Sequence, residues 1–448
     1  MTDRDHMCLG AFFYPTGYHV GAWRHPEVPS DAGVNIRHYV ELARTAERGL
    51  FDFLFLPDSA AMRGKDRTAL SRTAIRYVAQ FEPLTLLGAL AAVTENIGLT
   101  ATVSSSYNEP YHVARKIASL DHISSGRAGW NLVTSQNPEE ALNFGRESQP
   151  DHGARYERAR EFAEVVTGLW QTWEEDGLVL DKERGQFFDP AKLHTLDHRG
   201  DHFAVRGPLN IPRPPQGLPV TIQSGSSEAG RDLAARHADV VFTAQFDFEG
   251  AQAFRADIRD RAEHHGRDPD SVRVLVGVMP FVGSDAAAAR AKSDRLQELI
   301  HPDVALSLLG SELGGVDLAG CDPNGPLPEL PPSNAGRSRQ ALLVEMAESE
   351  GLSVLELARR VAGSRGHWQP VGSAEECAEE LERWFREGAA DGFIVIPAQL
   401  PGSLRDFVDT VVPSLQRRGV FRRSYRGRTL REHLGLLRSP AGESAVSS

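Results

Sequence analysis

The chain has 448 residues, 41% hydrophobic and 25% charged, values that suit a globular protein with a large buried core. Its 61 acidic and 49 basic residues give a formal net charge of −12, which argues against nucleic acid or an anionic membrane surface as a partner. The cysteines Cys8, Cys321 and Cys377 form neither a CxxC pair nor a zinc spacing. Residues 1–6 carry no signal segment and residues 83–93 are too short to span a bilayer, so we expect a reduced, cytoplasmic protein.

Short apolar or β-branched runs recur along the chain, and most are followed by a helix-like stretch. The predicted strands are Met7–Tyr14, Phe51–Leu56, Ile97–Val103, Ala128–Val133, Pro219–Gln223, Val240–Thr243, Val272–Val278 and Phe393–Ile396. The predicted helices between them include Ile36–Arg48, Val113–Leu120, Tyr156–Trp170 and Glu228–His237. This alternation indicates an α/β fold with right-handed crossovers and a parallel sheet. A count of eight strands favours closure into a (β/α)8, or TIM, barrel over an open doubly wound sheet.

Two long excursions interrupt the alternation, at about residues 171–217 and 285–390. The first is rich in charge and proline, and we expect a hairpin in it. The second holds helical pieces, a Pro/Gly-rich loop and a predicted helix at Ala374–Gly388. Loops of this length in a compact domain usually act as lids or added subdomains. We therefore predict one barrel domain over residues 1–436 with two insertions, followed by a disordered tail at 437–448.

Polar and aromatic residues follow the predicted strands, at the end where a parallel barrel places its active site. They include Tyr14, Asp58, Thr102, Asn131, Thr134, Ser224 and Gln245. A large, flat, amphipathic ligand would use such a rim, with aromatic rings against its own rings and amides or carboxylates against its heteroatoms. Asp58 could equally be a carboxylate catalyst.

The segment Gln223–Ala238 predicts a strand, a Gly/Ser turn and a helix that begins near Glu228. The N–H groups of that helix start, with the Ser226 and Ser227 hydroxyls, could cradle a phosphate. A serine cap without any ligand fits the same residues equally well. A hydrolase nucleophile elbow would need glycine in place of Ala229.

His152 and Tyr156 lie four residues apart near another predicted helix start and share a face. They could reach a phosphate, although a capped helix end with a packed tyrosine explains them as well. No P-loop and no G-x-G-x-x-G after a strand occurs, which argues against a dinucleotide fold.

Three histidines, His194, His198 and His202, have the spacing of metal ligands on a helix. Gly200 breaks that period, so we expect solvated loop histidines and no metal site. The pair at 264–265 lies on a charged predicted helix and is expected on the surface.

A set of collinear segments carries a resemblance to a known family. They are GYHVGAWRHP (17–26), FDFLFLPDS (51–59), residues 81–135, HGARYERAREF (152–162), residues 200–245, DGFIVIP (391–397) and TLREHLGL (429–436). In these segments the chain resembles the bacterial-luciferase-like flavin monooxygenases. Within that family it is similar to the branch of nitrilotriacetate, EDTA, dibenzothiophene-sulfone and long-chain alkane monooxygenases.

The resemblance implies a luciferase-like TIM barrel that takes FMN as FMNH2 from a separate NAD(P)H-dependent flavin reductase. Such enzymes use O2 through a C4a-(hydro)peroxyflavin to oxygenate a small organic substrate. This chemistry needs a dry pocket under a lid, which the two excursions could supply. The resemblance also implies a homodimer or homotetramer.

The resemblance assigns roles to individual residues. Flavin contacts fall on Asp58, Thr102 and Asn131 at the ring system and on His152, Tyr156, Ser226 and Ser227 at the ribityl phosphate. His19 and Trp23 fall on the first loop, which faces the substrate, and both are candidate catalytic residues. His19 is the better candidate to hydrogen-bond the substrate or the peroxyflavin. Some relatives carry a second histidine just before a G-x-D-L stretch. Here that stretch reads SELGGVDL, with Glu312 and no histidine.

Two functions from other classes stay open. One is a deazaflavin (F420)-dependent oxidoreductase, which would transfer a hydride without consuming O2. The other is a non-catalytic flavin-binding protein. The first loop carries several aromatic residues, which favours an apolar or aromatic substrate over a polyanion. They are Phe12, Phe13, Tyr14, Tyr18 and Trp23.

Overall fold

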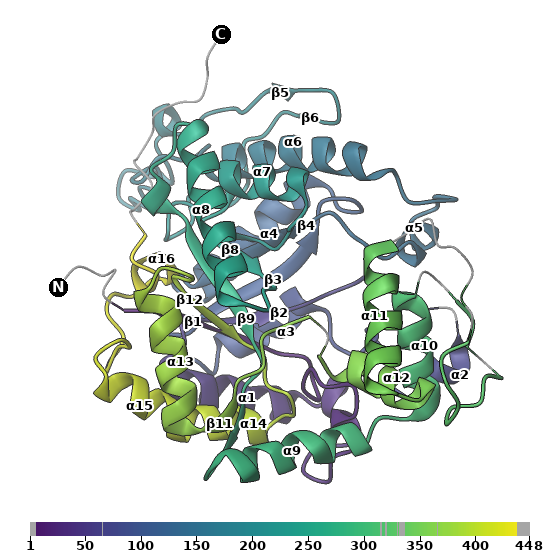
Figure 1. The fold of residues 1–448 in the computed structure, drawn as a ribbon. Helices are drawn as coiled ribbons and strands as arrows, with labels where there is room; N and C mark the ends of the chain where they lie inside the picture. Colours follow the sequence, from purple (N-terminus) through teal and green to yellow (C-terminus); the bar gives the residue numbers. More distant parts are fainter. Residues whose placement is uncertain are drawn as a thin grey trace.

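A computed structural model gives the fold of the chain (Figure 1). It describes residues 6–436 apart from 65, 314–315, 319, 329, 331–336 and 365. The predicted tail at 437–448 lies outside the described residues.

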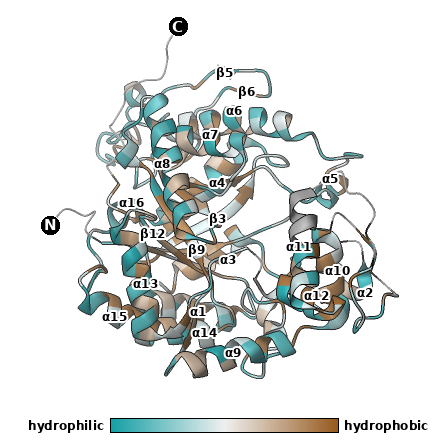
Figure 2. Ribbon diagram, in the orientation of Figure 1, coloured by the Kyte–Doolittle hydropathy of each residue, from teal (hydrophilic) through white to brown (hydrophobic). Residues whose placement is uncertain are grey.

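Eight parallel strands form a closed barrel in the order β1-β12-β9-β8-β7-β4-β3-β2. They are β1 (Cys8–Phe12), β2 (Phe53–Leu56), β3 (Gly98–Ser104), β4 (Ala128–Val133), β7 (Val220–Gln223), β8 (Val240–Thr243), β9 (Arg273–Val278) and β12 (Gly392–Val395). Each predicted strand is present, and the predicted barrel is confirmed. The strands β1, β2 and β12 are buried along their whole length, because helices cover the outside and side chains fill the inside. Figure 2 shows this as hydrophobic colour concentrated on the barrel strands.

Helices surround the barrel and connect its strands (Figure 1). Those outside the second insertion are α1 (Ile36–Arg48), α2 (Arg67–Leu70), α3 (Pro83–Ala91), α4 (Pro110–Ile123), α5 (Glu139–Asn143), α6 (His152–Trp170), α7 (Glu228–His237), α8 (Phe248–His264), α14 (Gly402–Asp406), α15 (Val412–Arg417) and α16 (Leu430–His433). Helix α6 begins four residues before the predicted Tyr156, because the Asp151 carboxylate caps it by accepting from the Ala154 N–H at 3.0 Å. In the described part of the chain, no helix combines the length and apolarity that a membrane crossing requires.

The first insertion contains the expected hairpin, formed by β5 (His198–Arg199) and β6 (Ala204–Val205). Its histidines pair with glutamates: His198 Nε2 lies 2.9 Å from Glu161, and His194 Nε2 lies 2.7 Å from Glu174. Nowhere in the described residues do three His, Cys, Asp or Glu side chains come together as a metal site.

The second insertion is mainly helical. It contains α9 (Ala286–Glu298), α10 (Pro302–Glu312), α11 (Arg337–Glu350), α12 (Val354–Ser364) and α13 (Ala374–Arg386). A short parallel pair, β10 (Phe281–Gly283) and β11 (Val371–Ser373), joins the end of the seventh barrel strand to its return segment. Helices α10, α11 and α12 stand together beside the barrel in Figure 1. Helix α13 ends two residues before the predicted Gly388, which adopts a φ of +78°.

Candidate active site

A cavity of about 720 Å³ opens at the carboxyl ends of the barrel strands. Four of the predicted flavin contacts line it: Asp58, Thr102, Asn131 and Tyr156. They come from the segment after β2, from β3 and β4, and from α6, so the fold brings together residues that are up to 98 positions apart. Two groups of lining residues stand out: hydrogen-bonded polar side chains, called here the polar side, and a cluster of rings around Phe12, Phe55 and Phe242, called here the aromatic side.

The polar side is built on the three neighbouring strands β3, β4 and β7. Thr102 and Asn131 are direct partners in the parallel register, and Asn131 Nδ2 donates to Thr102 Oγ1 at 2.9 Å. Ser224, just after β7, donates its hydroxyl to Asn131 Oδ1 at 3.2 Å. Asn131 is only 2% exposed, so these bonds fix its amide in one orientation. This side offers hydroxyl and amide groups that suit the heteroatoms of a flat ring system.

Asp58 stands at the edge of the polar side, directly after β2. Burial raises the pKa of its carboxyl group to about 7, and repulsion from the nearby Glu82 and Glu140 adds to the effect. Near neutral pH, therefore, a large fraction of this carboxyl group is protonated. In the protonated form the carboxyl group can donate a hydrogen bond as well as accept one. It could therefore pair with either an acceptor or a donor atom of a ring system.

Glu140 is a cavity residue that no local sequence pattern marks. It is 4% exposed and accepts from the hydroxyls of Ser59 at 2.8 Å and Ser135 at 2.7 Å. Ser135 also lies 2.6 Å from the Ser104 hydroxyl. These bonds tie together the segments that follow β2, β3 and β4, and they hold the polar rim in shape.

The predicted phosphate cradle lies beside the cavity, where α7 begins. Ser227 caps this helix, with its hydroxyl accepting from the Gly230 N–H at 3.2 Å. The N–H groups of Glu228 and Ala229 precede the first intrahelical bond and point out of the helix start. A Cβ atom added to Gly225 would lie 2.9 Å from the Tyr156 hydroxyl and 3.0 Å from the Gly230 Cα. Only glycine therefore fits this turn, and the Tyr156 hydroxyl lies directly against it.

His152, in the first turn of α6, is the remaining predicted phosphate contact. Its ring lies 4.7 Å from the ring of Tyr156, centroid to centroid, as the predicted shared face requires. His152 and Ser226 are exposed, whereas Tyr156 is buried. The cradle is therefore exposed to solvent on the side of His152 and Ser226, whereas Tyr156 and Gly225 line the cavity as well as the cradle.

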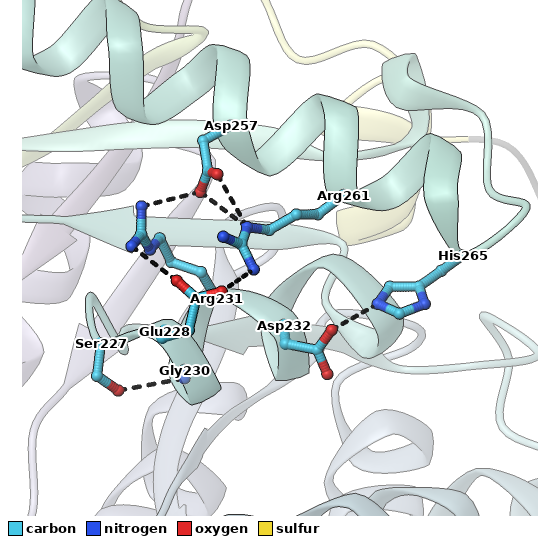
Figure 3. Close-up of polar contacts among 8 residues, drawn as sticks. All are labelled: Ser227, Glu228, Gly230, Arg231, Asp232, Asp257, Arg261 and His265. Carbon is cyan, nitrogen blue, oxygen red and sulfur yellow. Dashed lines mark hydrogen bonds and ion pairs between the residues drawn. The ribbon is translucent and has the colours of Figure 1, made fainter.

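Ion pairs lock the cradle helix α7 onto α8 (Figure 3). Glu228, in the first turn of α7, lies 3.1 Å from Arg231 and 2.8 Å from Arg261. Both arginines also bind Asp257, at 3.0 Å and 2.9 Å, so two cations and two anions alternate in a ring. The carboxylate of Glu228 is therefore engaged on the α8 side of the helix start.

A second contact joins the middle of α7 to the residue that follows α8. His265 Nε2 lies 2.8 Å from Asp232 Oδ1 (Figure 3). The prediction that the pair at 264–265 is simply surface is therefore wrong for His265, which is partly buried, and right for His264, which is exposed.

The aromatic side of the cavity gathers rings from distant parts of the chain. The Phe12 ring stacks on Phe55 at 5.4 Å and meets Tyr18 edge-on at 5.5 Å. Phe242 lies 5.6 Å from Phe55 and stacks at 5.8 Å on the imidazole of His367. Phe12 and Tyr18 were predicted from the sequence, whereas Phe55, Phe242 and His367 were not. Phe55 and Phe242 lie inside predicted strands, where an aromatic ring is equally typical of the core, and His367 lies within the second insertion.

The first loop does not place its predicted residues on the cavity. His19 is 1% exposed, and its Nδ1 accepts from the Gly21 N–H at 3.1 Å within the loop. Trp23 is 38% exposed, and its indole N–H donates to the Arg72 carbonyl at 3.1 Å. Neither residue is among those that line the cavity, so their assigned roles stay predictions. Glu312 is exposed at the end of α10.

Comparison with known proteins agrees with this geometry. A family model described as luciferase-like monooxygenase matches residues 11–392. The N-acetyl-S-(2-succino)cysteine monooxygenase of Bacillus subtilis (strain 168) is 50% identical, over 97% of this chain and 98% of that protein. Nitrilotriacetate monooxygenase component A of Aminobacter aminovorans is 47% identical, with 98% of each chain covered. A riboflavin lyase solved with modified FMN and riboflavin is 32% identical, with 96% of each chain covered and a TM-score of 0.83.

Proposed function

The chain belongs to the luciferase-like monooxygenase family, and we propose that it is the oxygenase component of a two-component system that uses FMNH2 and O2. Flavin-dependent oxygenation is the chemistry of this family, so the chain is a flavin-dependent monooxygenase. The finer parts of the proposal are the identity of the flavin, its delivery in reduced form and the class of substrate.

The assignment of FMN as the cofactor rests on one observation, that the polar side and the cradle are continuous. Tyr156 lines the cavity and also touches the Gly225–Gly230 turn, so one molecule with a ring system and a phosphate could span both. Thr102, Asn131 and Asp58 would hold the ring heteroatoms. The cradle N–H groups and the hydroxyls of Ser226, Ser227 and Tyr156, with the imidazole of His152, would hold the phosphate. When bound, FMNH2 supplies the activation of O2.

The protein's own contribution is to bind, orient and exclude water. The hydrogen-bonded Thr102–Asn131–Ser224 chain presents fixed polar groups, which need no rearrangement when a ring binds. The aromatic side keeps water away from the reacting atoms. Separate delivery of reduced flavin is supported by the name of the Aminobacter aminovorans relative, which is one component of a larger system.

The lining favours an apolar or aromatic substrate over a polyanion. Its acidic residues Asp58, Glu82 and Glu140 outnumber the basic residues Arg63 and Lys116, so a polycarboxylate would meet net repulsion when Asp58 is ionised. The aromatic side offers flat apolar faces instead.

The test is an anaerobic titration of the purified protein with FMNH2 and, separately, with reduced riboflavin. We expect FMNH2 to bind at least about tenfold more tightly, because the cradle makes charge-assisted hydrogen bonds to the phosphate. Oxygen uptake is then measured with a flavin reductase, NADH and either dibenzothiophene sulfone or nitrilotriacetate. Product formation from the sulfone supports the proposal. Failure to bind FMNH2 would overturn the cofactor assignment, and turnover of nitrilotriacetate alone would overturn the substrate class.

A further inference from the structure

Gln223 is the last residue of β7, and its side chain reaches from the barrel to the turn that leads into the cradle. It pairs with Leu132 of β4 in the parallel register, so the barrel fixes its backbone. The side chain is 3% exposed and lines the cavity. Its carboxamide oxygen accepts from the Gly225 N–H at 2.8 Å. A side chain of the barrel rim thus holds the backbone of the turn.

Gly225 is held by side chains from two elements. It is buried, so its N–H needs an acceptor within the protein, and the Gln223 carboxamide supplies one. A Cβ atom added to Gly225 would lie 2.6 Å from Nε2 of Gln223 and 2.9 Å from the Tyr156 hydroxyl. Both groups therefore lie against the same face of the glycine. Movement of the turn would break the hydrogen bond and disturb both contacts.

The same turn connects the polar side to the cradle. At one end, the Ser224 hydroxyl donates to Asn131 Oδ1 at 3.2 Å, which ties the turn to the polar side. At the other end, Ser227 caps α7 by accepting from the Gly230 N–H at 3.2 Å (Figure 3). The residues from 223 to 227 therefore set the position of the cradle relative to the polar side. The bond from Gln223 to Gly225 fixes the conformation of this short stretch.

We propose that Gln223 is a positioning residue, which sets the preference of the site for a flavin with a phosphate on its ribityl chain. It acts through Gly225: by holding that peptide, it keeps the N–H groups at the start of α7 at the right distance from the polar side. A cradle that is already in place loses less conformational freedom when the phosphate binds. This inference rests on the proposed function, because it assumes that the flavin ring lies at the polar side and the phosphate at the cradle.

The first test is the anaerobic titration of Gln223→Met with FMNH2 and with reduced riboflavin. Methionine has a similar length and volume but lacks the carboxamide oxygen that accepts from Gly225. Affinity for FMNH2 should fall about three- to tenfold, the range that one neutral hydrogen bond gives. Affinity for reduced riboflavin should stay within about twofold of wild type, because riboflavin has no phosphate to place in the cradle.

Gln416→Met is the matched control. Gln416 lies in α15, and its carboxamide also bonds to the backbone, with Nε2 donating to the Arg422 carbonyl at 2.8 Å. The substitution therefore removes the same atoms and one bond between a side chain and the backbone, away from the residues that line the cavity. The ratio of the two flavin affinities should be that of the wild type.

Hydrogen exchange of the flavin-free protein, followed by mass spectrometry, tests the turn itself. The segment 223–230 should exchange about three- to tenfold faster in Gln223→Met than in wild type, because the Gly225 N–H has lost its acceptor. Gln223→Glu keeps an oxygen that can accept, so the exchange should stay slow. If Gln223→Met does not fold, Gln223→Asn, whose side chain is one CH2 group shorter, replaces it in both measurements.

The possible results separate the inference from the proposed function. Equal weakening of both flavins in Gln223→Met would overturn the inference, because a general loosening of the barrel rim would not distinguish them. Unchanged FMNH2 affinity in this variant would overturn it as well, whatever the exchange rate. If the wild type prefers FMNH2 and Gln223→Met keeps that preference, only the inference fails. If the wild type binds no FMNH2, the proposed function itself fails and the inference falls with it.

Discussion

The polar and aromatic sides of the cavity differ in what holds their side chains in place. On the polar side, Thr102, Asn131 and Ser224 sit on adjacent strands and are joined directly by hydrogen bonds. On the aromatic side, rings as far apart in sequence as Phe12 and His367 are held by packing. A hydrogen bond is lost entirely when one partner is removed, and the buried partner is left unpaired. The free-energy cost of removing a packed side chain instead grows with the volume that is lost. Substitutions on the two sides should therefore have different consequences.

The largest effect is expected on the aromatic side, from Phe55→Ala. Phe55 is 2% exposed and contacts both Phe12 and Phe242. The cavity left by its ring should lower the free energy of unfolding by about 3–4 kcal/mol, measured by urea denaturation. Phe55→Leu, which fills most of the space, should cost less than half of that. If Phe55→Leu stays folded and yet loses FMN binding, the two sides are not independent.

Asn131→Leu should have the next largest effect and should act on the polar side. It leaves the buried hydroxyl of Thr102 and that of Ser224 without their amide partner, so we expect a loss of about 2–3 kcal/mol in unfolding free energy. FMN affinity should fall at least about tenfold, whereas Phe55→Leu should leave it nearly unchanged. The milder Thr102→Val removes one hydroxyl at constant shape and should reproduce a part of both losses. Equal losses of FMN affinity in Asn131→Leu and Phe55→Leu would contradict the division into two sides.

Asp58 makes the free energy of unfolding depend on pH through the polar side, whereas the carbon rings of the aromatic side do not titrate. Its pKa is about 7 in the folded protein, raised by burial, and near its ordinary value when unfolded. The folded state therefore holds the proton more tightly. The stability that Asp58 contributes is complete below about pH 4 and is lost as the pH rises through about 7.

Asp58→Asn removes this titration. It should raise the unfolding free energy at pH 8 by about 2 kcal/mol, after allowance for partial solvent screening, and should change it little at pH 4. Urea unfolding of both proteins across this pH range measures the difference. A constant difference at all pH values would show that Asp58 is ionised throughout.

The smallest effect is expected from Arg261→Met, behind the cradle. Without Arg261, the Glu228 carboxylate loses one of its two cations and is freer to turn toward the helix start. FMN affinity should fall about two- to fourfold, because the Glu228 carboxylate would repel the phosphate of FMN. Riboflavin has no phosphate, so its affinity should not change. The double variant Arg261→Met/Glu228→Gln should restore FMN binding. Equal weakening of both flavins would instead indicate a shift of α7 as a whole.

The barrel and much of the polar side could be predicted from the sequence. Strands buried on both faces appear as uninterrupted apolar runs, so Ala128–Val133 and Val240–Thr243 were predicted to the residue. Because the carboxyl ends of parallel strands meet at one rim, residues just after those runs, such as Asp58, were expected to come together, and they do. The starts of α6 and α7 carry their own capping residues and were equally local signals.

The sequence predicted Phe12 and Tyr18, but only the tertiary structure decided which other residues join them on the aromatic side. His367 lies within the second insertion, between α12 and the short strand β11, so its place at the cavity depends on how β9 and the return segment pair. Glu140 lies in a short helix after β4, and only folding brings Ser59 to it. His19 shows the converse: the backbone of its loop bonds to Ala398 after β12, and the imidazole turns into a local contact with Gly21. The reason is common to all three residues: a local pattern fixes which face of an element is buried, whereas contacts between distant segments depend on the closure of the whole barrel.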